Sequence, residues 1–343
     1  MNNRVVYLDS LKGLLCVVVF LFHYISTFNS LTGINIVDKT LLEGGTLHIF
    51  VDGVFAVKLF LIISAYSVAR SITFGTDLSK LITKRYFRLA IPVGITLIIV
   101  FFFQRFYFIE GVIKYTNQEW LNSFLPHYSI LLFLKNLFFS IVCGYNDFLG
   151  VAWMLKYIFF GTFIVLLLKI GTNDKSAHSK LILIAMFFII SYALDPLYSL
   201  FPVGVFFETF EKKINSINKS NVISLLFVIL GFLFYFINRL GFFSIMSAVF
   251  FMASVIMNVN FQKLLSTKSL EKLGEFSFSL YLVHCPLIFS FTAYFFLNFG
   301  GNSLVLFLLT CLVLLFISFI YHQIFEKRIS LFLENKIVKY LNS

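Results

Sequence analysis

Residues 7–24 read YLDSLKGLLCVVVFLFHY, an apolar run that carries an aspartate, a lysine and a histidine. The run approaches the ~20 residues that an α-helix needs to cross the hydrocarbon core of a bilayer. Comparable apolar runs recur along the 343 residues, and they are continuous rather than alternating. Continuous runs indicate helices, because transmembrane β-strands alternate apolar and polar side chains. The stretch therefore predicts the first helix of an all-α polytopic membrane protein.

The composition of the whole chain supports this fold class. Hydrophobic residues make up 59% of the sequence and charged residues only 13%, whereas a soluble domain has roughly 25% charged residues. A water-soluble form would expose large apolar patches. We therefore expect no soluble domain, and we interpret residues 1–343 as a single integral-membrane domain in contact with membrane lipid.

The net charge of +11 does not indicate a nucleic-acid partner, because lysine and arginine lie in short loops between apolar segments. Loops of this kind are retained in the cytoplasm. We expect no nucleic-acid binding and place both termini in the cytoplasm. The basic residues expected on that side are Arg4 and Lys12, Lys80–Arg88, Lys169–Lys180, Lys212–Lys219, Lys263–Lys272 and Lys327–Lys339.

Hydropathy and charge together predict about ten transmembrane helices. Their approximate bounds are 10–29, 50–72, 89–109, 149–169, 181–198, 200–212, 221–238, 242–259, 274–297 and 303–325. The segment 128–143 is open: if it spanned the membrane, every later loop would change side. An interfacial or re-entrant segment fits the positive-inside rule better.

The first helix carries its polar residues on one face. Lys12 and His23 are eleven residues apart, a net rotation of only about 20° at 100° per residue. Asp9 and Cys16 fall on the same stripe. Ionisable groups in hydrocarbon are costly unless they face the protein interior, so the stripe points inward and favours function. The alternatives are a lysine that snorkels to the interface and a histidine hydrogen-bonded across helices.

Three further stretches combine polar residues with apolar helices. They are KLFLIISAY at 58–66, KRYFRLAIP at 84–92 and LGEFSFSLYLVHCP at 273–286. Arg85 and Arg88 share a helical face and could bind a polyphosphate, or only lipid headgroups. Tyr281 and His284 are neighbours on one face and could form a purely structural hydrogen bond.

In order and spacing, these stretches resemble the membrane acyltransferase 3 family, of the bacterial polysaccharide O-acetyltransferase type. That family has an arginine ten residues before a histidine in its first helix, where this chain has Lys12 and His23. Ala65 and Phe278 also replace a usual glycine and tyrosine, and no carboxylate follows Trp153. Glu326 resembles the family's terminal glutamate, with an interfacial charge as the alternative.

The resemblance implies transfer of an acyl group, usually acetyl from acetyl-CoA, to a hydroxyl of a surface polysaccharide or lipid-linked glycan. It implies a bacterial inner membrane as the location. His23 would be the general base or a transient acyl carrier, with Asp9 and Lys12 on its face. Arg85 and Arg88 would hold the cofactor acetyl-CoA. The residues expected to line the substrate site are Ser64, Tyr281 and His284.

Two other functions fit the same intramembrane polar residues. A glycan or lipid transporter or flippase could use histidine and lysine as a proton relay. A structural subunit of an export complex would not need the polar stripe. The four cysteines are far apart in the sequence, with no metal-ligand spacing, so we expect small buried apolar side chains and no metal.

Overall fold

The computed structural model describes residues 5–42, 45–73, 77–144, 147–217, 221–301, 303–333 and 336. Within these ranges all regular secondary structure is helical, as the continuous apolar runs predict. Arg4, Lys219 and Lys339, which belong to the predicted basic clusters, lie outside the described residues. The chain divides into two compact units, each of which is described by itself.

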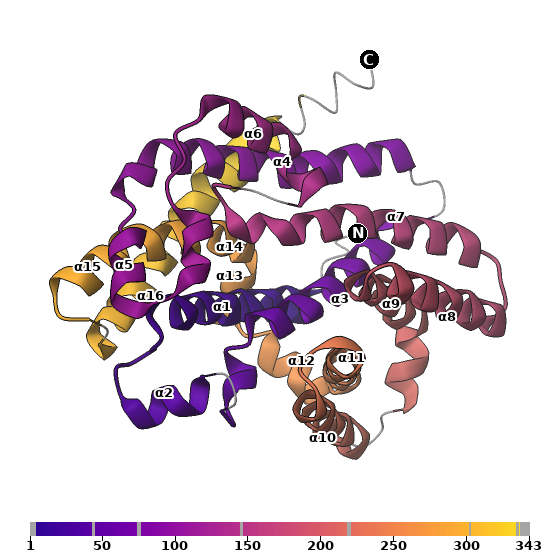
Figure 1. Cartoon of the computed structure of the whole chain (residues 1–343). Helices are drawn as coiled ribbons and strands as arrows, with labels where there is room; N and C mark the ends of the chain where they lie inside the picture. Colours follow the sequence, from indigo (N-terminus) through magenta and orange to yellow (C-terminus); the bar gives the residue numbers. More distant parts are fainter. Residues whose placement is uncertain are drawn as a thin grey trace. The chain divides into compact units, whose positions relative to one another are not determined.

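Unit 1 comprises Met1–Leu15, Val54–Asp77 and Tyr157–Glu275. It holds the start of α1 (Val6–Phe28), nearly all of α3 (Gly53–Ser71) and most of α7 (Trp153–Thr172). The remaining elements are α8 (Ala177–Leu194), η5 (Pro196–Ser199), α9 (Leu200–Ile217), α10 (Asn221–Ile237), α11 (Gly241–Met257), α12 (Val259–Leu265) and α13 (Lys268–Glu275). Helices α10 and α11 lie side by side, joined by a short turn (Figure 1).

Unit 2 comprises Cys16–Gly53, Leu78–Lys156 and Phe276–Ser343. Besides the second half of α1, its long helices are α4 (Leu78–Phe103) and α16 (Leu304–Tyr321). Its shorter helices are α2 (Asn35–Leu41), α5 (Ile109–Thr116), α6 (Ile130–Cys143), α14 (Ser277–Leu287) and α15 (Ala293–Asn298). Its single turns and π-helical segments are η1 (His48–Phe50), η2 (Gln104–Phe106), η3 (Glu119–Phe124), η4 (Gly150–Ala152), η6 (Ile288–Thr292) and η7 (His322–Ser330).

Seven helical segments within the described residues are long and apolar enough to cross a bilayer. An eighth would be the pair α11 and α12, which is bent by 90°. The chain is thus an all-α polytopic membrane protein. The prediction of ten spans adds α10, which is apolar but shorter, and the segment 200–212, which begins α9.

The open segment 128–143 forms the 14-residue helix α6. At 1.5 Å per residue such a helix is about 21 Å long, whereas the hydrocarbon core is about 30 Å thick. The Ser129 hydroxyl accepts a hydrogen bond from the Leu132 N–H at its start, and Gly144 ends it with a φ of +65°. This length favours the interfacial or re-entrant interpretation.

Large apolar side chains cover the outer faces of several spans. In α8, Ile189 is 66% exposed and Leu194 79% exposed; in α16, Val305 is 75% exposed and Leu312 67% exposed. Water would not solvate such a surface, but lipid chains do. These exposed faces are therefore what the membrane covers.

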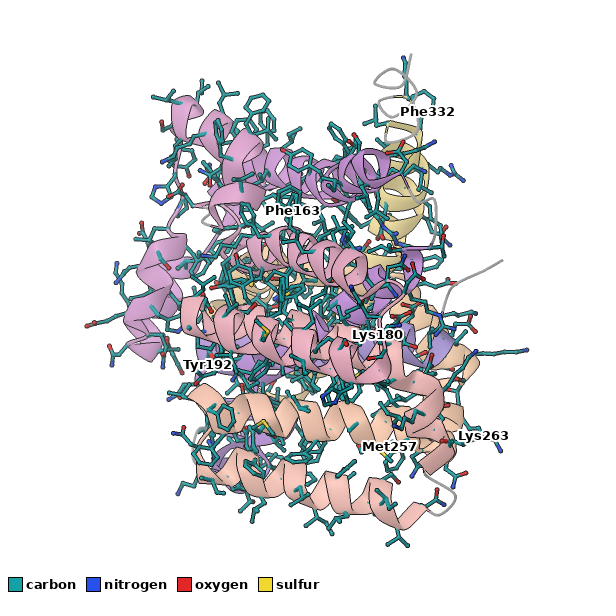
Figure 2. All side chains as sticks on the ribbon, turned by 90° about the vertical axis from the view of Figure 1, so that its right-hand side faces the viewer. Phe163, Lys180, Tyr192, Met257, Lys263 and Phe332 are labelled. Atoms are coloured by element: carbon teal, nitrogen blue, oxygen red, sulfur yellow. The ribbon has the colours of Figure 1, made fainter. Side chains whose placement is uncertain are left out.

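The ends of unit 1 carry different residues. Lys180 in α8 and Lys263 in α12 lie toward one end of the unit, whereas Tyr192 lies toward the other (Figure 2). Lysine at one end and an aromatic ring at the opposite interface is a common arrangement for membrane helices. That the loops carrying these two lysines share the cytoplasmic side stays a prediction.

Two glycines of unit 1 permit an unusually close approach of α1 and α13. A Cβ on Gly274 would lie 2.4 Å from the Asp9 carbonyl oxygen, and a Cβ on Gly13 would lie 2.8 Å from the Gly274 nitrogen. Small residues allow such backbone contact between membrane helices. Gly204 of α9 packs in the same way on α3: a Cβ on Gly204 would lie 2.5 Å from the Ala65 Cβ, so position 204 has no room for a side chain.

Candidate active site

The charged residues at the start of α1 neutralise each other within unit 1. Lys12 Nζ lies 2.9 Å from Asp9 Oδ1, with side-chain exposures of 20% and 23%. The same ammonium donates to Ser67 Oγ of α3 over 3.5 Å. An i, i+3 spacing on a helix brings the two groups together. Lys12 is therefore held by the protein instead of extending freely to the interface.

His23 follows Lys12 on the same unbroken helix α1 and belongs to unit 2. Its ring centroid lies 5.2 Å from that of His284 and 6.3 Å from that of Trp120. Its Nδ1 is buried and has no hydrogen-bond partner within the described part of the chain. A buried polar atom without a partner is destabilising, and such atoms mark functional sites. The predicted inward orientation of His23 is consistent with these contacts.

His284 is fully buried in α14. Its Nδ1 lies 3.3 Å from the Leu280 carbonyl oxygen, and its Nε2 is buried with no partner among the residues that the structure describes. The Tyr281 hydroxyl instead donates to the Val151 carbonyl oxygen of η4. The His–Tyr hydrogen bond considered as an alternative is therefore absent, although the two rings lie 5.9 Å apart. The Nδ1 contact favours a proton on that nitrogen and leaves a lone pair on Nε2.

Cys285, the residue that follows His284 in α14, lies close to both histidines. One donor atom from each of His23, His284 and Cys285 lies within 4.8 Å of the others. Such donor atoms are typical ligands of a transition metal. We call these three residues the histidine–cysteine cluster. Chemically, its neutral imidazoles can accept a proton from a substrate, and its three donors together can hold a metal ion.

The helix that carries His284 and Cys285 is irregular just beyond them. Pro286 cannot donate a backbone hydrogen bond, and the π-helical segment η6 follows it at Ile288–Thr292. The Ser290 hydroxyl donates to the Pro286 carbonyl oxygen over 2.6 Å. Single π-helical turns often occur at functional sites. This local widening is the consequence of the proline in the sequence motif.

Trp120 is a residue that the sequence analysis missed. It lies in η3, where its indole N–H donates to the Ser26 carbonyl oxygen, one turn beyond His23 in α1, over 3.2 Å. Its ring therefore rests beside the His23 ring. The chain has only two tryptophans, and a tryptophan in a polar loop between spans is the signal that could have identified it.

Glu326 is more than an interfacial charge. Its carboxylate accepts a 2.7 Å hydrogen bond from Ser279 Oγ of α14 and lies 2.8 Å from His322 Nδ1. Its side chain is 21% exposed. The sequence indicated Glu326 through its resemblance to the family's terminal glutamate. It did not indicate Ser279 or His322 as the partners of this carboxylate. Through Ser279 it fixes the start of the helix that carries His284.

The other predicted residues are distributed over both units. Arg85 and Arg88 lie in α4 of unit 2, where Arg85 is half-buried and Arg88 exposed. Ser64 is buried in α3 of unit 1, the unit that also holds Asp9 and Lys12. Within unit 2 the His284 ring lies beside the rings of both His23 and Tyr281, whereas their role in a site stays a prediction.

Comparison with known proteins identifies the family of the chain. A family model described as an acyltransferase domain, acyltransferase 3, matches residues 5–322, nearly the whole chain. No curated protein and no solved structure matched. The matched range contains all four resembling stretches and the complete histidine–cysteine cluster, and it stops short of Glu326. The chain belongs to the acyltransferase 3 family and is a membrane acyltransferase.

Proposed function

We propose that the protein is a transmembrane O-acyltransferase that moves an acetyl group from cytoplasmic acetyl-CoA to a hydroxyl of a surface polysaccharide or lipid-linked glycan. The observation that carries this proposal is the pair His23 and His284: each ring has one buried nitrogen without a partner among the described residues, in a chain that belongs to an acyltransferase family. A sugar hydroxyl is a poor nucleophile until a base removes its proton, and neutral imidazole does this near pH 7.

In this mechanism the free nitrogen of His23 takes the proton from the acceptor hydroxyl. The hydroxyl oxygen forms the new ester bond with the acetyl carbon, and the carbon–sulfur bond of the donor breaks. The proton passes from the imidazole to the sulfur, so that coenzyme A leaves as the thiol. The same residue could instead carry the acetyl group transiently on nitrogen, which would divide the transfer into two steps.

His284 would contribute the second free nitrogen to the acceptor or to the developing oxyanion. Its Nδ1 faces the Leu280 carbonyl oxygen, which keeps Nε2 in one tautomer. Tyr281 would support this arrangement by anchoring α14 to Val151 of η4. Ser64 remains a proposed contact to the acceptor, from α3 of unit 1.

The donor would be held on the cytoplasmic side by charge. Arg85 and Arg88 are three residues apart on α4, so both guanidinium groups can reach one polyphosphate. Guanidinium–phosphate pairs are bidentate and charge-assisted, which suits the pyrophosphate and 3′-phosphate of coenzyme A. The ion pair of Lys12 and Asp9 would lie on the same polar stripe of α1 as His23, about 16 Å before it along the helix.

The transporter and structural-subunit interpretations are not supported by any further observation. The family match is to acyltransferases over nearly the whole chain. Since a proton relay would need no acyl donor, dependence on acetyl-CoA separates these functions.

The decisive experiment uses a deletion strain of the source organism. Mass spectrometry of its surface glycans should show the loss of one acetyl group per modified unit. The wild-type gene and a His178→Ala variant should both restore the modification, because His178 is exposed at the start of α8. A His23→Ala variant that inserts at normal levels should not restore it. Unchanged glycans in the deletion strain, or full rescue by His23→Ala, would contradict the proposal.

A further inference from the structure

The histidine–cysteine cluster has a composition that acid–base chemistry alone does not explain. In the part of the chain that the structure describes, His23 and His284 both carry a buried ring nitrogen without a partner, and the Cys285 thiol lies within 4.8 Å of them. A general base needs one imidazole and no sulfur. Two imidazoles and a thiol are instead the donor set that borderline-soft divalent metals prefer.

We propose that His23, His284 and Cys285 form a binding site for a divalent transition metal of the zinc type, and that the bound ion inhibits acyl transfer. The three side chains come from two helices of unit 2, α1 and α14, that are far apart in the sequence. No ligand-spacing motif links them, which is why the sequence alone predicts no metal there.

The distances allow a bound ion after small side-chain rotations. Zinc binds nitrogen at about 2.0–2.1 Å and sulfur at about 2.3 Å, so tetrahedral ligands stand about 3.3–3.7 Å apart. The present limit of 4.8 Å means that the donors must close by about 1 Å on binding. Rotation about the side-chain bonds of His23 and Cys285 is enough for a movement of this size.

Outer contacts prepare His284 as a ligand. Histidines that bind metals usually direct their other ring nitrogen to a carbonyl or carboxylate, which fixes the tautomer. His284 does this through Nδ1 and the Leu280 carbonyl oxygen, 3.3 Å away. Three protein ligands leave one tetrahedral position open to water or a substrate oxygen. On binding, the Cys285 thiol loses its proton to solvent and coordinates as thiolate.

Inhibition follows from the role proposed for His23, and this part of the inference rests on the proposed function. A nitrogen that donates its lone pair to a metal ion cannot take a proton from the acceptor hydroxyl. Zinc should therefore reduce acyl transfer in proportion to the occupied fraction of the cluster, and a chelator should restore it.

Metal binding can be measured without any acyl substrate. The full-length protein, purified in nanodiscs and treated with EDTA, would be titrated with ZnCl₂ against a chelating dye, and with CoCl₂ while the near-ultraviolet absorption is recorded. We expect one ion per chain and a cobalt–thiolate absorption band. Cys285→Ser should abolish the band, and both Cys285→Ser and His284→Ala should weaken zinc binding by about tenfold or more, the range seen when metal-site contacts are removed.

Cys311→Ser is the matched control, because Cys311 is a free, half-buried cysteine of α16 outside the cluster. It should retain both the band and the affinity. Serine at position 285 preserves size, and thermal unfolding of each variant reports whether it folds. Less than one ion per chain in the wild-type protein, or affinity that none of the cluster substitutions changes, would overturn the metal site.

The second arm measures acetyl transfer with and without ZnCl₂, each variant being compared with its own metal-free activity. Wild-type activity should fall with zinc and recover with EDTA, and Cys285→Ser should require about tenfold more zinc for the same inhibition. If zinc binds at the cluster but transfer is unaffected, the inhibitory role is wrong. If zinc binds and no transfer occurs at all, the proposed function fails while the metal site stands.

Discussion

Two ion pairs of unit 1 and the two site histidines of unit 2 differ in how their polar groups are satisfied. In unit 1, charged side chains within the spans are paired: Lys169 lies 2.9 Å from Glu208, and Arg70 lies 2.9 Å from Glu211. In the described residues of unit 2, His23 and His284 each keep a buried nitrogen without a partner. Paired charges satisfy the fold, whereas unpaired imidazoles weaken it and remain available to a ligand. The contrast assigns stability to the first set and chemistry to the second.

The strongest test of this contrast is His23→Ala. Loss of a general base reduces turnover by about 10²–10⁴-fold. Because Nδ1 has no hydrogen-bond partner to lose among the described residues, only the ring contacts with Trp120 and His284 are lost, and the melting temperature should fall only slightly. Transfer of labelled acetyl and fluorescence-detected thermal unfolding, measured on the same preparation, check both halves. His178→Ala should change neither, and a large loss of stability in His23→Ala would remove the contrast.

Removal of the guanidinium groups in α4 extends the comparison to donor binding. Arg85→Gln with Arg88→Gln should raise the KM for acetyl-CoA by about tenfold or more at unchanged kcat, since each charge-assisted hydrogen bond contributes about 1.5–3 kcal/mol. Arg105→Gln is the matched control, being exposed in η2 beyond the end of α4. Steady-state kinetics against acetyl-CoA provide the readout, and an unchanged KM would indicate that the pair only contacts lipid headgroups.

Breaking an ion pair of unit 1 should lower the stability of the protein and leave its activity unchanged, the reverse of the result expected for His23→Ala. In Lys169→Ala, Glu208 keeps a partly buried charge, at 18% side-chain exposure, without its partner. A polar group left unsatisfied lowers the free energy of unfolding by about 1–3 kcal/mol. Activity per folded molecule should not change. Thermal unfolding of Lys169→Ala, Glu208→Ala and the double variant isolates the pair, with the exposed Lys175→Ala as control.

The smallest effect is expected from Lys12→Arg, which restores the residue that the resemblance leads us to expect. Arginine keeps the positive charge beside Asp9, and ion pairs at partly exposed sites contribute only about 0–1 kcal/mol. Transfer activity should therefore change by about threefold or less. Lys12→Met should lower it much further. If both variants were equally impaired, the ammonium itself, and not its charge, would be the required group.

The fold class and part of the candidate site could be predicted from the sequence. Apolar runs predicted an all-α membrane protein, and the spacing on α1 predicted one face shared by Asp9, Lys12 and His23. Both follow from the repeat of a single helix, which is local information. The resemblance identified His284 as a site residue, and its place beside His23 agrees with that expectation.

Other features depend on contacts that no local pattern encodes. Trp120 beside His23, Ser279 bonded to Glu326, and Cys285 within reach of both histidines arise from the packing of distant segments. Cys285 was interpreted as a small apolar residue because the four cysteines are far apart in the sequence and show no metal-ligand spacing. Tyr281 turned to the Val151 carbonyl oxygen instead of its helix neighbour, because a long-range acceptor was available.

The glycine contact in unit 1 has a consequence for how this chain can vary. Gly13 belongs to the N-terminal motif and Gly274 to the C-terminal one. A Cβ on Gly13 would meet the backbone of residues 273–274, and a Cβ on Gly274 would meet the backbone of residues 9–10. The two motifs therefore constrain each other sterically, although they are some 260 residues apart in the sequence. A first helix with a larger residue at position 13 should therefore fold only with a compensating change in residues 273–275, which couples the variation of the two segments.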